Sequence, residues 1–442
     1  MSDESSGKGV WRTLPAVFWA VVVMEFFERG AYYGLWSVLS VYMVDPVSSG
    51  GLGFTKPAVG LIKGTITPLL YALPILSGAL ADRFGYKRTL LVAFSLLTTG
   101  HFLSGRVTSY WVIFATLTVM ALGAGTFKPI VSGTIARVTD KDTSSVAFGL
   151  YYWSINLGAF VFPLFLVTWA KSVSWSAVFY LSAACTGVMV LPTLLWFRDP
   201  PRPANTKPVG QVLREAALVL TDVRFMLMIV IYSGFWIMYF QMFDTVLWYL
   251  KDHVDMSPIN AVVNFVLAKA RIRYVFKFDA EHVTVINGGT IIALQLLISS
   301  LVKNTRALPT MIIGLGLGTA GFLLLAVSSN PWVFIAGMIV FSIGEMTAHP
   351  KYYSYISQIA PEDKKATYMG YSFLYGIIGS SVGGIVGAFL YARLVDRMHM
   401  PRVLWLLFTG LGVVTMLGLL AYDRWIAPTA RTGRAAQENR PG

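Results

Sequence analysis

Cysteine is almost absent from the sequence, since the only one, Cys185, lies inside an apolar run. A disulfide framework and a cysteine-ligated zinc site are therefore excluded. Charged residues are also scarce, at 13% of the chain. The protease spacings G-x-G-D and H-E-x-x-H do not occur, and no serine nucleophile elbow appears in the context that motif needs. We therefore expect no enzymatic activity and no bound metal, and a hydrolase that uses paired acids stays an alternative.

Long apolar segments dominate the rest of the chain. Hydrophobic residues make up 55% of it, the mean hydropathy is +0.63, and runs of membrane length recur. This composition predicts an all-α membrane protein. The apolar segment after residue 13 is too long and too charged at its centre for a cleaved signal sequence, so we expect it to stay as the first span. We expect twelve transmembrane helices, centred near residues 29, 69, 97, 122, 156, 185, 237, 292, 317, 344, 378 and 413.

The net charge of +13 and the isoelectric point near 9.6 indicate either nucleic-acid binding or orientation in a bilayer. An even number of spans puts both termini on one side. With the termini inside, about 20 basic residues lie on the cytoplasmic side against about 12 outside, as orientation requires. We therefore favour orientation and expect no nucleic-acid partner. Because the loops are short, we expect the lipid bilayer of a bacterial plasma (inner) membrane, with both termini cytoplasmic. We also expect a monomer.

A proline-rich, charged stretch at 198–222 divides the chain. We expect an N-terminal six-helix bundle at 1–197, a cytoplasmic linker at 198–222 and a C-terminal six-helix bundle at 223–442. One constant offset of 221 residues relates the two halves without a gap. Homologous halves joined by a polar linker are typical of a transporter that alternates access to a site at the repeat interface. The offset pairs Gly123 with Gly344, Pro129 with Pro350, Asp142 with Asp363, Gly149 with Gly370, and Gly158 with Gly379.

The first predicted span has charged residues at its centre, in the stretch MEFFERGAYYG. Glu25 and Arg29 are four residues apart and share a helix face, with Glu28 beside them. Each buried charge costs at least about 2.5 to 3.5 kcal/mol at the bilayer centre. One arginine cannot neutralise two glutamates, so either one carboxyl group is protonated or a cation from another helix completes the set. Lys128, within GAGTFKPIV, is the candidate for that cation.

A second charged position lies in the tenth predicted span. Glu345 lies one turn before His349, which the 221-residue offset pairs with Lys128. If the glutamates of both spans face Arg29 and Lys128, the cavity contains one acid too many. A surplus acid suits a proton carrier, because its protonation follows whichever partner it holds. The alternative is that the charges of the first span only fix helix packing.

Two other features are expected at the membrane surfaces, and the position of a third, Asp244, is left undecided. Residues 251–281 are too polar to cross the membrane, so we expect an extracytoplasmic segment with a short amphipathic part. Lys351 lies near the inner end of its span and is expected to reach the lipid headgroups. Asp244 is either a pocket acid or a residue at the outer end of its helix.

Several motifs occur in a fixed order along the chain. They are E-x-x-E-R at Glu25, Glu28 and Arg29; AYYG with Tyr32 and Tyr33; the loop G-x-x-x-D-R-x-G-x-K-R with Asp82, Arg83, Lys87 and Arg88; Lys128-Pro129; YYWSINLGAF at 151–160; FWIMYFQ at 235–241; and GEMTAHP at 344–350. Together they resemble the proton-coupled oligopeptide transporter (POT/PTR) family of the major facilitator superfamily. The resemblance extends over essentially all the spans.

The resemblance implies the major facilitator fold of two pseudo-symmetric six-helix bundles. It also implies a symporter that imports di- and tripeptides by alternating access, with protons as the coupling ion and no other cofactor. In such a protein Lys128 would meet the peptide carboxylate or the helix 1 glutamates, and Glu345 would meet the peptide amino group. The resemblance assigns proton coupling to Glu25, Glu28, Arg29 and Lys128; substrate binding to Tyr32, Tyr33, Tyr71, Lys128, Asn156, Trp236, Asn287 and Glu345; and the cytoplasmic gate to Asp82, Arg83, Lys87 and Arg88.

One departure from the family pattern bears on function. Phe240 stands where members usually carry a glutamate that pairs with the helix 1 arginine and takes part in proton coupling. Arg29 must therefore pair with Glu25, Glu28 or Asp244. The linker is also too short for the two extra helices of many bacterial members. The alternative function is proton-coupled transport of another small solute, namely an amino-acid derivative, nitrate or an organic anion. A passive channel is a further alternative.

Overall fold

The computed structural model describes residues 14–140, 143–200, 209–361 and 364–427. Within these ranges every regular element is a helix, and no strand occurs. A helix satisfies its own backbone hydrogen bonds, which a segment inside lipid cannot do in an open strand. The prediction of an all-α membrane protein is confirmed.

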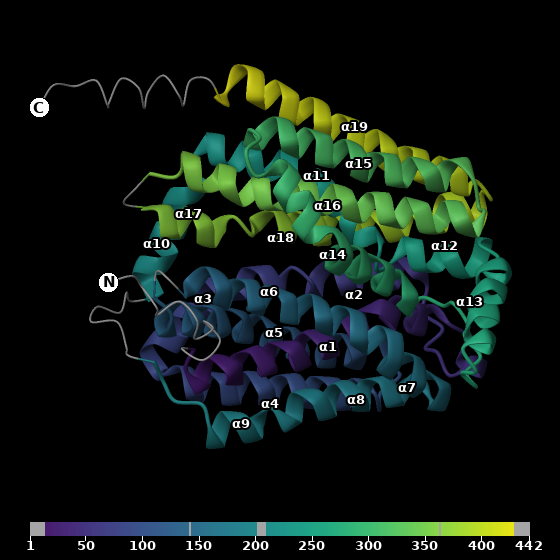
Figure 1. Cartoon of the computed structure of the whole chain (residues 1–442), viewed down its shortest axis with the longest axis horizontal. Coiled ribbons are helices and arrows are strands. Elements are labelled where there is room, and N and C mark those ends of the chain that lie inside the picture. The colour runs from purple at the N-terminus through teal and green to yellow at the C-terminus, as the bar shows by residue number, and fades with distance from the viewer. Residues whose placement is uncertain (1–13, 141–142, 201–208, 362–363, 428–442) are drawn as a thin grey trace, which may run out of the picture. The chain divides into compact units, whose positions relative to one another are not determined.

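Contacts among the helices divide the chain into two units. The N-terminal unit comprises Met1–Gly53 and Leu69–Leu213, and the C-terminal unit comprises Phe54–Pro68 and Arg214–Gly442. This division differs from the one expected at the linker, because the first half of the second span packs with the C-terminal unit. Figure 1 shows that the long helices of each unit run side by side.

In the N-terminal unit, α1 packs against α6 and α8, while α3 and α4 pack against α5. α1 also contacts α5, so the helix with the E-x-x-E-R motif and the helix with Lys128 are neighbours. The helices of this unit are α1 (Ala16–Val44), η2 (Val47–Ser49), α3 (Leu69–Phe84), α4 (Tyr86–Ser104), α5 (Tyr110–Val138), α6 (Ser144–Val161), the π-helix η3 (Phe162–Val167), α7 (Thr168–Val173), α8 (Trp175–Val188) and α9 (Val190–Leu195).

In the C-terminal unit, α16 packs against α14 and α15, and α18 packs against α11 and α2. The helices that belong to this unit or lead into it are α2 (Lys56–Ile66), α10 (Val209–Leu220), α11 (Val223–Gln241), α12 (Thr245–His253), α13 (Ser257–Lys269), α14 (Glu281–Val302), α15 (Ala307–Val327), α16 (Pro331–Ile359), α17 (Lys365–Tyr371), α18 (Leu374–Leu390), the π-helix η5 (Tyr391–Arg397) and α19 (Pro401–Trp425).

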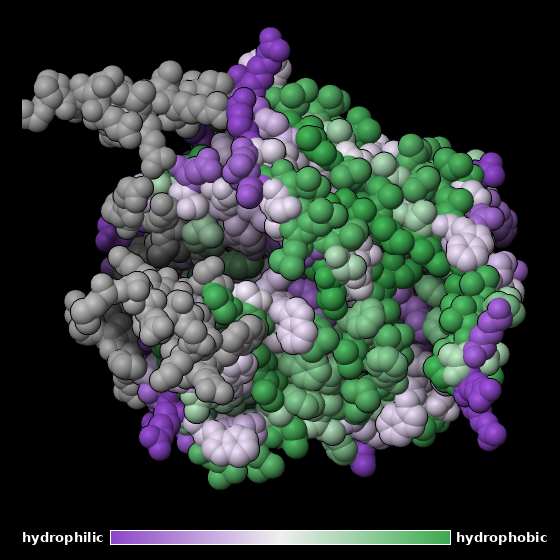
Figure 2. Space-filling model, viewed as in Figure 1, coloured by the Kyte–Doolittle hydropathy of each residue, from purple (hydrophilic) through white to green (hydrophobic). Residues whose placement is uncertain are grey.

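The predicted spans are present. Ten segments within the described ranges are long and apolar enough to cross a membrane. α1, with 29 residues, and α4, with 19, complete a set of twelve. Each of the twelve predicted centres falls inside one of these segments, so their positions are confirmed. Figure 2 shows hydrophobic residues over the middle of the visible face and hydrophilic ones toward its ends, as a multi-pass membrane protein requires.

The internal repeat also holds in the structure. α5 and α16 each have 29 residues, and adding 221 to both bounds of α5 gives both bounds of α16. A Cβ on Gly158 would lie 2.7 Å from a backbone carbonyl oxygen of α1, and one on Gly379 would lie 3.1 Å from a backbone carbonyl carbon of α11. Both positions need glycine because a neighbouring backbone leaves no room for a side chain. The predicted pair Asp142 and Asp363 lies outside the described residues.

A proline interrupts α5 near Lys128, and a neighbouring helix repairs the break. Pro129 has no N–H to donate to the carbonyl oxygen of Gly125, four residues earlier. Ser77 of α3 donates its hydroxyl to that oxygen at 3.0 Å. Inside a membrane no water is at hand to satisfy a freed carbonyl, so this bond ties α3 to α5 where the helix is weakest.

A second serine-to-carbonyl hydrogen bond of this kind joins α2 to α18. Pro68 separates α2 from α3 and leaves the carbonyl oxygen of Gly64 without its helical donor, and Ser381 of α18 donates to that oxygen at 2.8 Å. The two helices approach closely, since a Cβ on Gly384 would lie 2.9 Å from the backbone nitrogen of Gly64. This packing explains why the first half of the second span belongs with the C-terminal unit.

Candidate functional site

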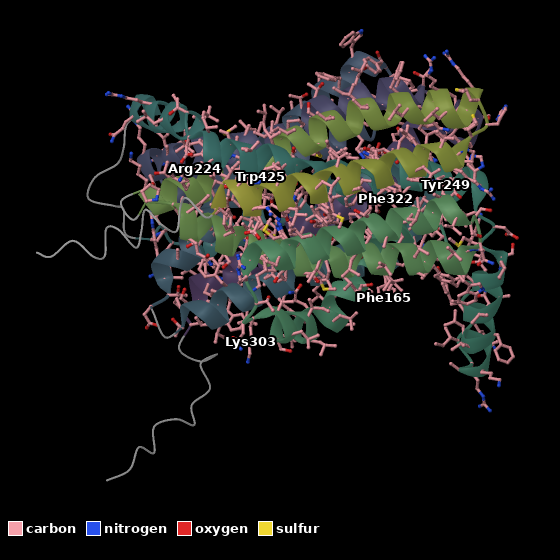
Figure 3. The ribbon with its side chains drawn as sticks, turned by 90° about the horizontal axis from the view of Figure 1, so that it is seen from above. Phe165, Arg224, Tyr249, Lys303, Phe322 and Trp425 are labelled. Carbon is pink, nitrogen blue, oxygen red and sulfur yellow. The ribbon has the colours of Figure 1, made fainter. Side chains whose placement is uncertain are left out.

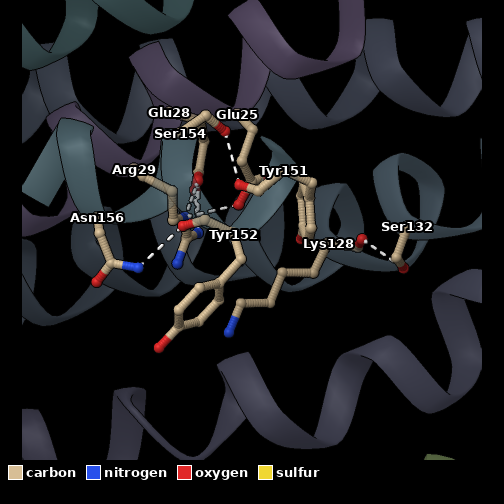
Figure 4. Close-up of polar contacts among 9 residues, drawn as sticks. All are labelled: Glu25, Glu28, Arg29, Lys128, Ser132, Tyr151, Tyr152, Ser154 and Asn156. Carbon is tan, nitrogen blue, oxygen red and sulfur yellow. Dashed lines mark hydrogen bonds and ion pairs between the residues drawn. The ribbon is translucent and has the colours of Figure 1, made fainter. Parts of the chain in front are cut away.

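The charges of α1 form a cluster in the N-terminal unit (Figure 4). Arg29 donates to both oxygens of Glu28, from Nε at 2.5 Å and from Nη2 at 2.7 Å. Its Nε also lies 3.4 Å from an oxygen of Glu25. All three residues are buried. Charge-assisted bidentate pairs of this kind are among the stronger polar contacts in proteins. Arg29 therefore finds its partners within its own helix, two of the three that the sequence allowed.

Glu25 is the surplus acid of this cluster. Glu28 occupies the arginine bidentately, whereas Glu25 makes only the longer ion pair. Both Glu25 oxygens are buried; neither accepts a hydrogen bond of ordinary geometry from the described residues, although the hydroxyl of Tyr151 is near enough to interact with Glu25. A carboxylate held so poorly is costly inside the membrane, and a proton would remove that cost.

Lys128 completes the cluster from α5. Glu25, Glu28 and Arg29 are near enough to act on its charge, but it makes no ion pair with any described residue. Its ammonium instead lies 5.2 Å from the centre of the Tyr71 ring, a cation–π contact. In Figure 4 the Lys128 ammonium and the Arg29 guanidinium point to the same side of these helices. Among the described residues of this cluster, Lys128 is thus the cation that is not paired with an acid.

The aromatic and amide residues predicted on this side lie around the cluster. Arg29 lies 4.9 Å from the centre of the Tyr32 ring, and the rings of Tyr32 and Tyr33 meet edge to face at 5.1 Å. Asn156 of α6 donates to the carbonyl oxygen of Tyr152 in its own helix at 2.9 Å. The structure therefore brings together the residues of the N-terminal unit that the motifs had assigned to one site.

In the C-terminal unit, Glu345 of α16 lies among neutral polar groups. Asn287 of α14 donates from Nδ2 to a Glu345 oxygen at 3.0 Å and to the hydroxyl of Ser342 at 3.0 Å. Glu345 makes no ion pair with any residue in the part of the chain that the structure describes. Asn287 and Glu345, predicted on separate helices, are thus direct neighbours.

His349 follows Glu345 by one turn and lies in an aromatic group. The hydroxyl of Tyr232 lies 3.2 Å from its Nδ1. The rings of Trp236 and Tyr353 lie 5.0 and 4.9 Å from the His349 ring. Trp236, predicted to bind substrate, therefore contacts the helix that carries Glu345. The meeting of this group with the cluster of α1 in one chamber stays a prediction.

The position of the missing glutamate is apolar, and a different ion pair lies close by. Phe240 packs against Trp236 and Tyr239. Asp244, in the break between α11 and α12, pairs with Lys63 of α2, whose ammonium also donates to the Phe243 carbonyl oxygen at 2.8 Å. The paired side chains are only 3% and 5% exposed. Asp244 is therefore a buried acid of the C-terminal unit.

Lys63 was missed by the sequence pattern. Lys63 was counted among the basic residues outside the membrane. That assignment is wrong, because Lys63 lies in the span Lys56–Phe84. A span of about 20 residues centred at residue 69 includes Lys63, so the sequence did contain this signal. Lys351 differs from expectation too. It is buried, and its ammonium donates to the carbonyl oxygen of Thr305 at 2.8 Å beyond the end of α14.

The predicted gate residues make contacts inside the N-terminal unit. Asp82 at the end of α3 pairs with Arg137 of α5 at 2.7 Å. Lys87 donates to the carbonyl oxygen of Leu194 in α9 at 2.7 Å, and Arg83 lies over the ring of Phe84. These contacts tie α3 to α5 and α4 to α9 within the unit. No contact of Arg88 contributes to them.

Comparison with known proteins supports the fold and the resemblance. The family model for the Major Facilitator Superfamily matches residues 21–383 and 275–441. A di-/tripeptide transporter of Lactococcus lactis subsp. lactis (strain IL1403) is 27% identical over 257 residues, which are 55% of this chain and 47% of that protein. The chain thus spans about half the length of this curated relative.

Two solved structures share the fold. A peptide transporter POT in complex with sulfate has a TM-score of 0.78 and 19% identity, over 94% of this chain and 95% of that one. A POT family transporter in complex with 5-aminolevulinic acid has a TM-score of 0.76 and 18% identity, over 94% and 99%. The fold that the motifs implied is confirmed.

Proposed function

Because the chain belongs to the Major Facilitator Superfamily, we propose that it is a proton-coupled symporter that imports di- and tripeptides by alternating access. The named peptide transporters among its relatives and structural neighbours support the substrate class. In this proposal the protein is a monomer in a bacterial inner membrane, with both termini cytoplasmic. Protons are its coupling ion, and it uses no other cofactor.

One observation carries the proposal. Within the described residues, Lys128 in the N-terminal unit and Glu345 in the C-terminal unit are partly buried, make no ion pair and have opposite signs. A short zwitterion supplies a carboxylate for the first and an ammonium for the second, so each buried charge is paired when substrate is present. Recognition of groups that all peptides share leaves the substrate's side chains loosely specified.

Glu25 is the proton carrier in this proposal. Arg29 is already neutralised by Glu28, so a second carboxylate in the same cluster leaves net negative charge in the membrane unless it is protonated. Lys128 lies near enough to Glu25 to stabilise its charged form when no substrate carboxylate is bound. A carboxylate that binds Lys128 withdraws this support, and Glu25 then takes up a proton. Substrate and proton thereby become coupled.

The loop after α3 acts at the cytoplasmic side. Asp82 and Arg83 lie at the end of α3, Lys87 and Arg88 lie at the start of α4, and the contacts of Asp82 and Lys87 tie α3 to α5 and α4 to α9. We assign these contacts to stiffening the inner end of the N-terminal unit, so that its helices move as one body when access changes. This refines the expectation that the same residues form the cytoplasmic gate.

Uptake by proteoliposomes tests the proposal. Purified protein is reconstituted, an inward pH gradient is imposed, and accumulation of labelled di- and tripeptides is compared with that of amino acids, nitrate and organic acids. We expect peptides with free termini to accumulate above equilibrium, and N-acetylated or C-amidated analogues to accumulate less. Collapse of the gradient by a protonophore should bring uptake down to equilibrium.

Each contrary outcome identifies another function. Uptake that never exceeds equilibrium and ignores the gradient indicates a passive channel. Peptide recovered in cleaved form, measured by mass spectrometry, indicates a hydrolase. Accumulation of nitrate or an organic acid in place of peptides contradicts the substrate class and retains the transporter.

A second candidate substrate is a small amino-acid derivative. Phe240 removes a charge that peptide transporters of the family usually have, and a structural neighbour carries 5-aminolevulinic acid, which has both an amino group and a carboxylate. Lys128 and Glu345 suit such a molecule by the same pairing of charges. Competition between 5-aminolevulinic acid and a dipeptide in the uptake assay ranks the two.

A further inference from the structure

Residues 257–278, here called the α13 segment, connect two spans of the C-terminal unit. The segment follows α12, whose span ends at His253, and precedes α14, whose span begins at Glu281. It consists of α13 and an extended stretch that turns back along it. In Figure 1 α13 follows α12 and runs at a steep angle to the long helices of its unit, and in Figure 3 a helix projects sideways on the side where Tyr249 is labelled. An interfacial helix lies in the membrane plane in this way.

The segment is a folded unit and not a loose loop. Arg271 has a positive φ of 58°, which reverses the chain directly after α13. Asn264 donates to the carbonyl oxygen of Phe276 at 2.9 Å and accepts from its N–H at 2.7 Å. Asn260, one turn earlier on the same face of α13, accepts from the N–H of Phe278 at 2.7 Å. Two asparagines thus hold the extended stretch against the helix and fix which face points away.

The face of α13 opposite the asparagines is apolar and exposed. Val262, Phe265, Val266 and Lys269 follow the spacing of one helix face. Phe265 is 61% exposed, and its two valine neighbours are exposed as well. The Lys269 ammonium lies 4.6 Å from the centre of the Phe265 ring, at the edge of this face. An ordered helix that leaves a phenylalanine and two valines uncovered needs an apolar partner.

The extended stretch adds further exposed apolar groups and positive charge. Val275 is 83% exposed, and Ile272 and Tyr274 are exposed too. Arg273 and Lys277 lie on either side of Val275 in sequence, and both are exposed. Between residues 257 and 278 the sequence has four basic residues and no acidic one: Lys269, Arg271, Arg273 and Lys277. The partner of this surface must therefore be apolar and anionic at once.

We propose that the α13 segment binds anionic phospholipids at the membrane surface. The spans on either side bring its two ends to the level of the lipid headgroups, so that layer is within reach. Val262, Phe265 and Val266 insert among the upper acyl chains, and the arginines and lysines contact lipid phosphates. The proposal rests on the segment and the spans that flank it, and it holds whatever solute the protein transports.

Lipid-specific fluorescence quenching tests this proposal on the full chain. Cys185 is replaced by alanine, and Phe265→Cys is labelled with an environment-sensitive fluorophore in liposomes of phosphatidylcholine with one fifth phosphatidylglycerol. Spin-labelled quenchers are placed at a shallow acyl position on one lipid or the other. We expect at least threefold stronger quenching per mole by labelled phosphatidylglycerol. Leu296→Cys, at an exposed position within the span of α14, is the control, and both lipids should quench it equally.

Charge variants separate lipid recognition from simple immersion. Lys269→Gln, Arg273→Gln and Lys277→Gln together should bring the ratio at position 265 to one. Lys269→Arg, Arg273→Lys and Lys277→Arg keep the charge and should keep the ratio. Equal quenching by the two lipids in the unsubstituted segment overturns the proposal, as does a ratio that survives neutralisation. Quenching by aqueous iodide alone, or protection from iodide and both lipids, overturns it as well, because the face is then in water or covered by protein.

Discussion

In the N-terminal unit Arg29 lies between two glutamates, whereas in the C-terminal unit Glu345 lies beside an amide and no cation. Lys128 and Glu345 lie on α5 and α16, which have the same length and are related by the 221-residue offset. The charged side chains of these two helices do not correspond. The offset pairs Lys128 with His349, and it pairs Glu345 with Ala124. Duplication preserved the helix and its close packing, while the charged positions diverged to opposite signs.

This difference separates two tasks. A cluster of several ionisable groups can exchange a proton among its members, because each member changes the charge felt by the others. A lone acid held by an amide has no charged neighbour whose state would change with its own protonation. We therefore assign proton coupling to the N-terminal unit and recognition of an amino group to the C-terminal unit. Each variant below tests this contrast.

The largest effect is expected from Glu25→Gln. The substitution keeps the size of the side chain and removes the proton-binding group, so proton-driven accumulation should be abolished. Counterflow exchange, which needs no net proton movement, should remain measurable. Both are read in the same proteoliposomes with labelled dipeptide inside or outside.

Glu28→Gln is the matched comparison. Glu28 is the bidentate partner of Arg29, and its loss leaves a buried arginine with one weak ion pair. We expect Glu28→Gln to lower thermal stability and to reduce accumulation and exchange alike. If Glu25→Gln lost both activities equally, or if Glu28→Gln lost accumulation alone, the proton carrier would be wrongly assigned.

Lys63→Ala should have the next largest effect, on stability. It leaves Asp244 buried without its cation, and breaking a buried pair in this way typically costs about 3 to 5 kcal/mol. The melting temperature of the detergent-purified protein should fall accordingly. The double variant Lys63→Met with Asp244→Leu removes both charges and should recover most of the loss. A single variant as stable as the unsubstituted protein would contradict the importance of this pair to the docking of α2.

The sequence analysis did not predict the Lys63–Asp244 pair, although it predicted contacts within one helix and the internal repeat. Glu25 and Arg29 are four residues apart, so spacing alone predicted their contact, whereas Glu28 was one of three partners left open for Arg29. The match of α5 and α16 was predictable because Gly123 and Gly344 both lie against the backbone of a neighbouring helix, where no other residue fits. Lys63 and Asp244 lie in different halves of the sequence, and no offset relates them.

Two other parts were missed for different reasons. α10 lies in the stretch treated as an irregular linker, because the prolines before it dominated the pattern. Its sequence VGQVLREAALVL has apolar residues at helical spacing, so the signal was there. Lys351 was expected at the headgroups, but it donates to the carbonyl oxygen of Thr305, an acceptor that only the folded chain brings near.

Lys128→Ala should change substrate selectivity by a smaller amount. A charge-assisted bond to a carboxylate contributes about 1.5 to 3 kcal/mol, so peptides with a free C-terminus should bind about 10-fold to 100-fold more weakly. C-amidated peptides should be nearly unaffected. Glu345→Gln is the mirror test, with free and N-acetylated peptides compared. Competition uptake gives the apparent affinities, and an equal loss for free and blocked peptides in either variant would count against that residue as the clamp.

The smallest effect is expected where serines repair proline breaks. Ser381→Ala removes the donor to the Gly64 carbonyl oxygen, and Ser77→Ala removes the donor to the Gly125 carbonyl oxygen. Hydrogen bonds between helices in membranes contribute about 0.6 kcal/mol on average, so each variant should lower the melting temperature only slightly.

The effects of the two serine variants on transport should differ. Ser77 joins two helices of one unit, whereas Ser381 holds α2, which is followed in the chain by a helix of the other unit. We therefore expect Ser381→Ala to alter the rate of exchange and Ser77→Ala to leave it unchanged. If both variants changed the exchange rate equally, the idea that α2 moves separately during transport would be wrong.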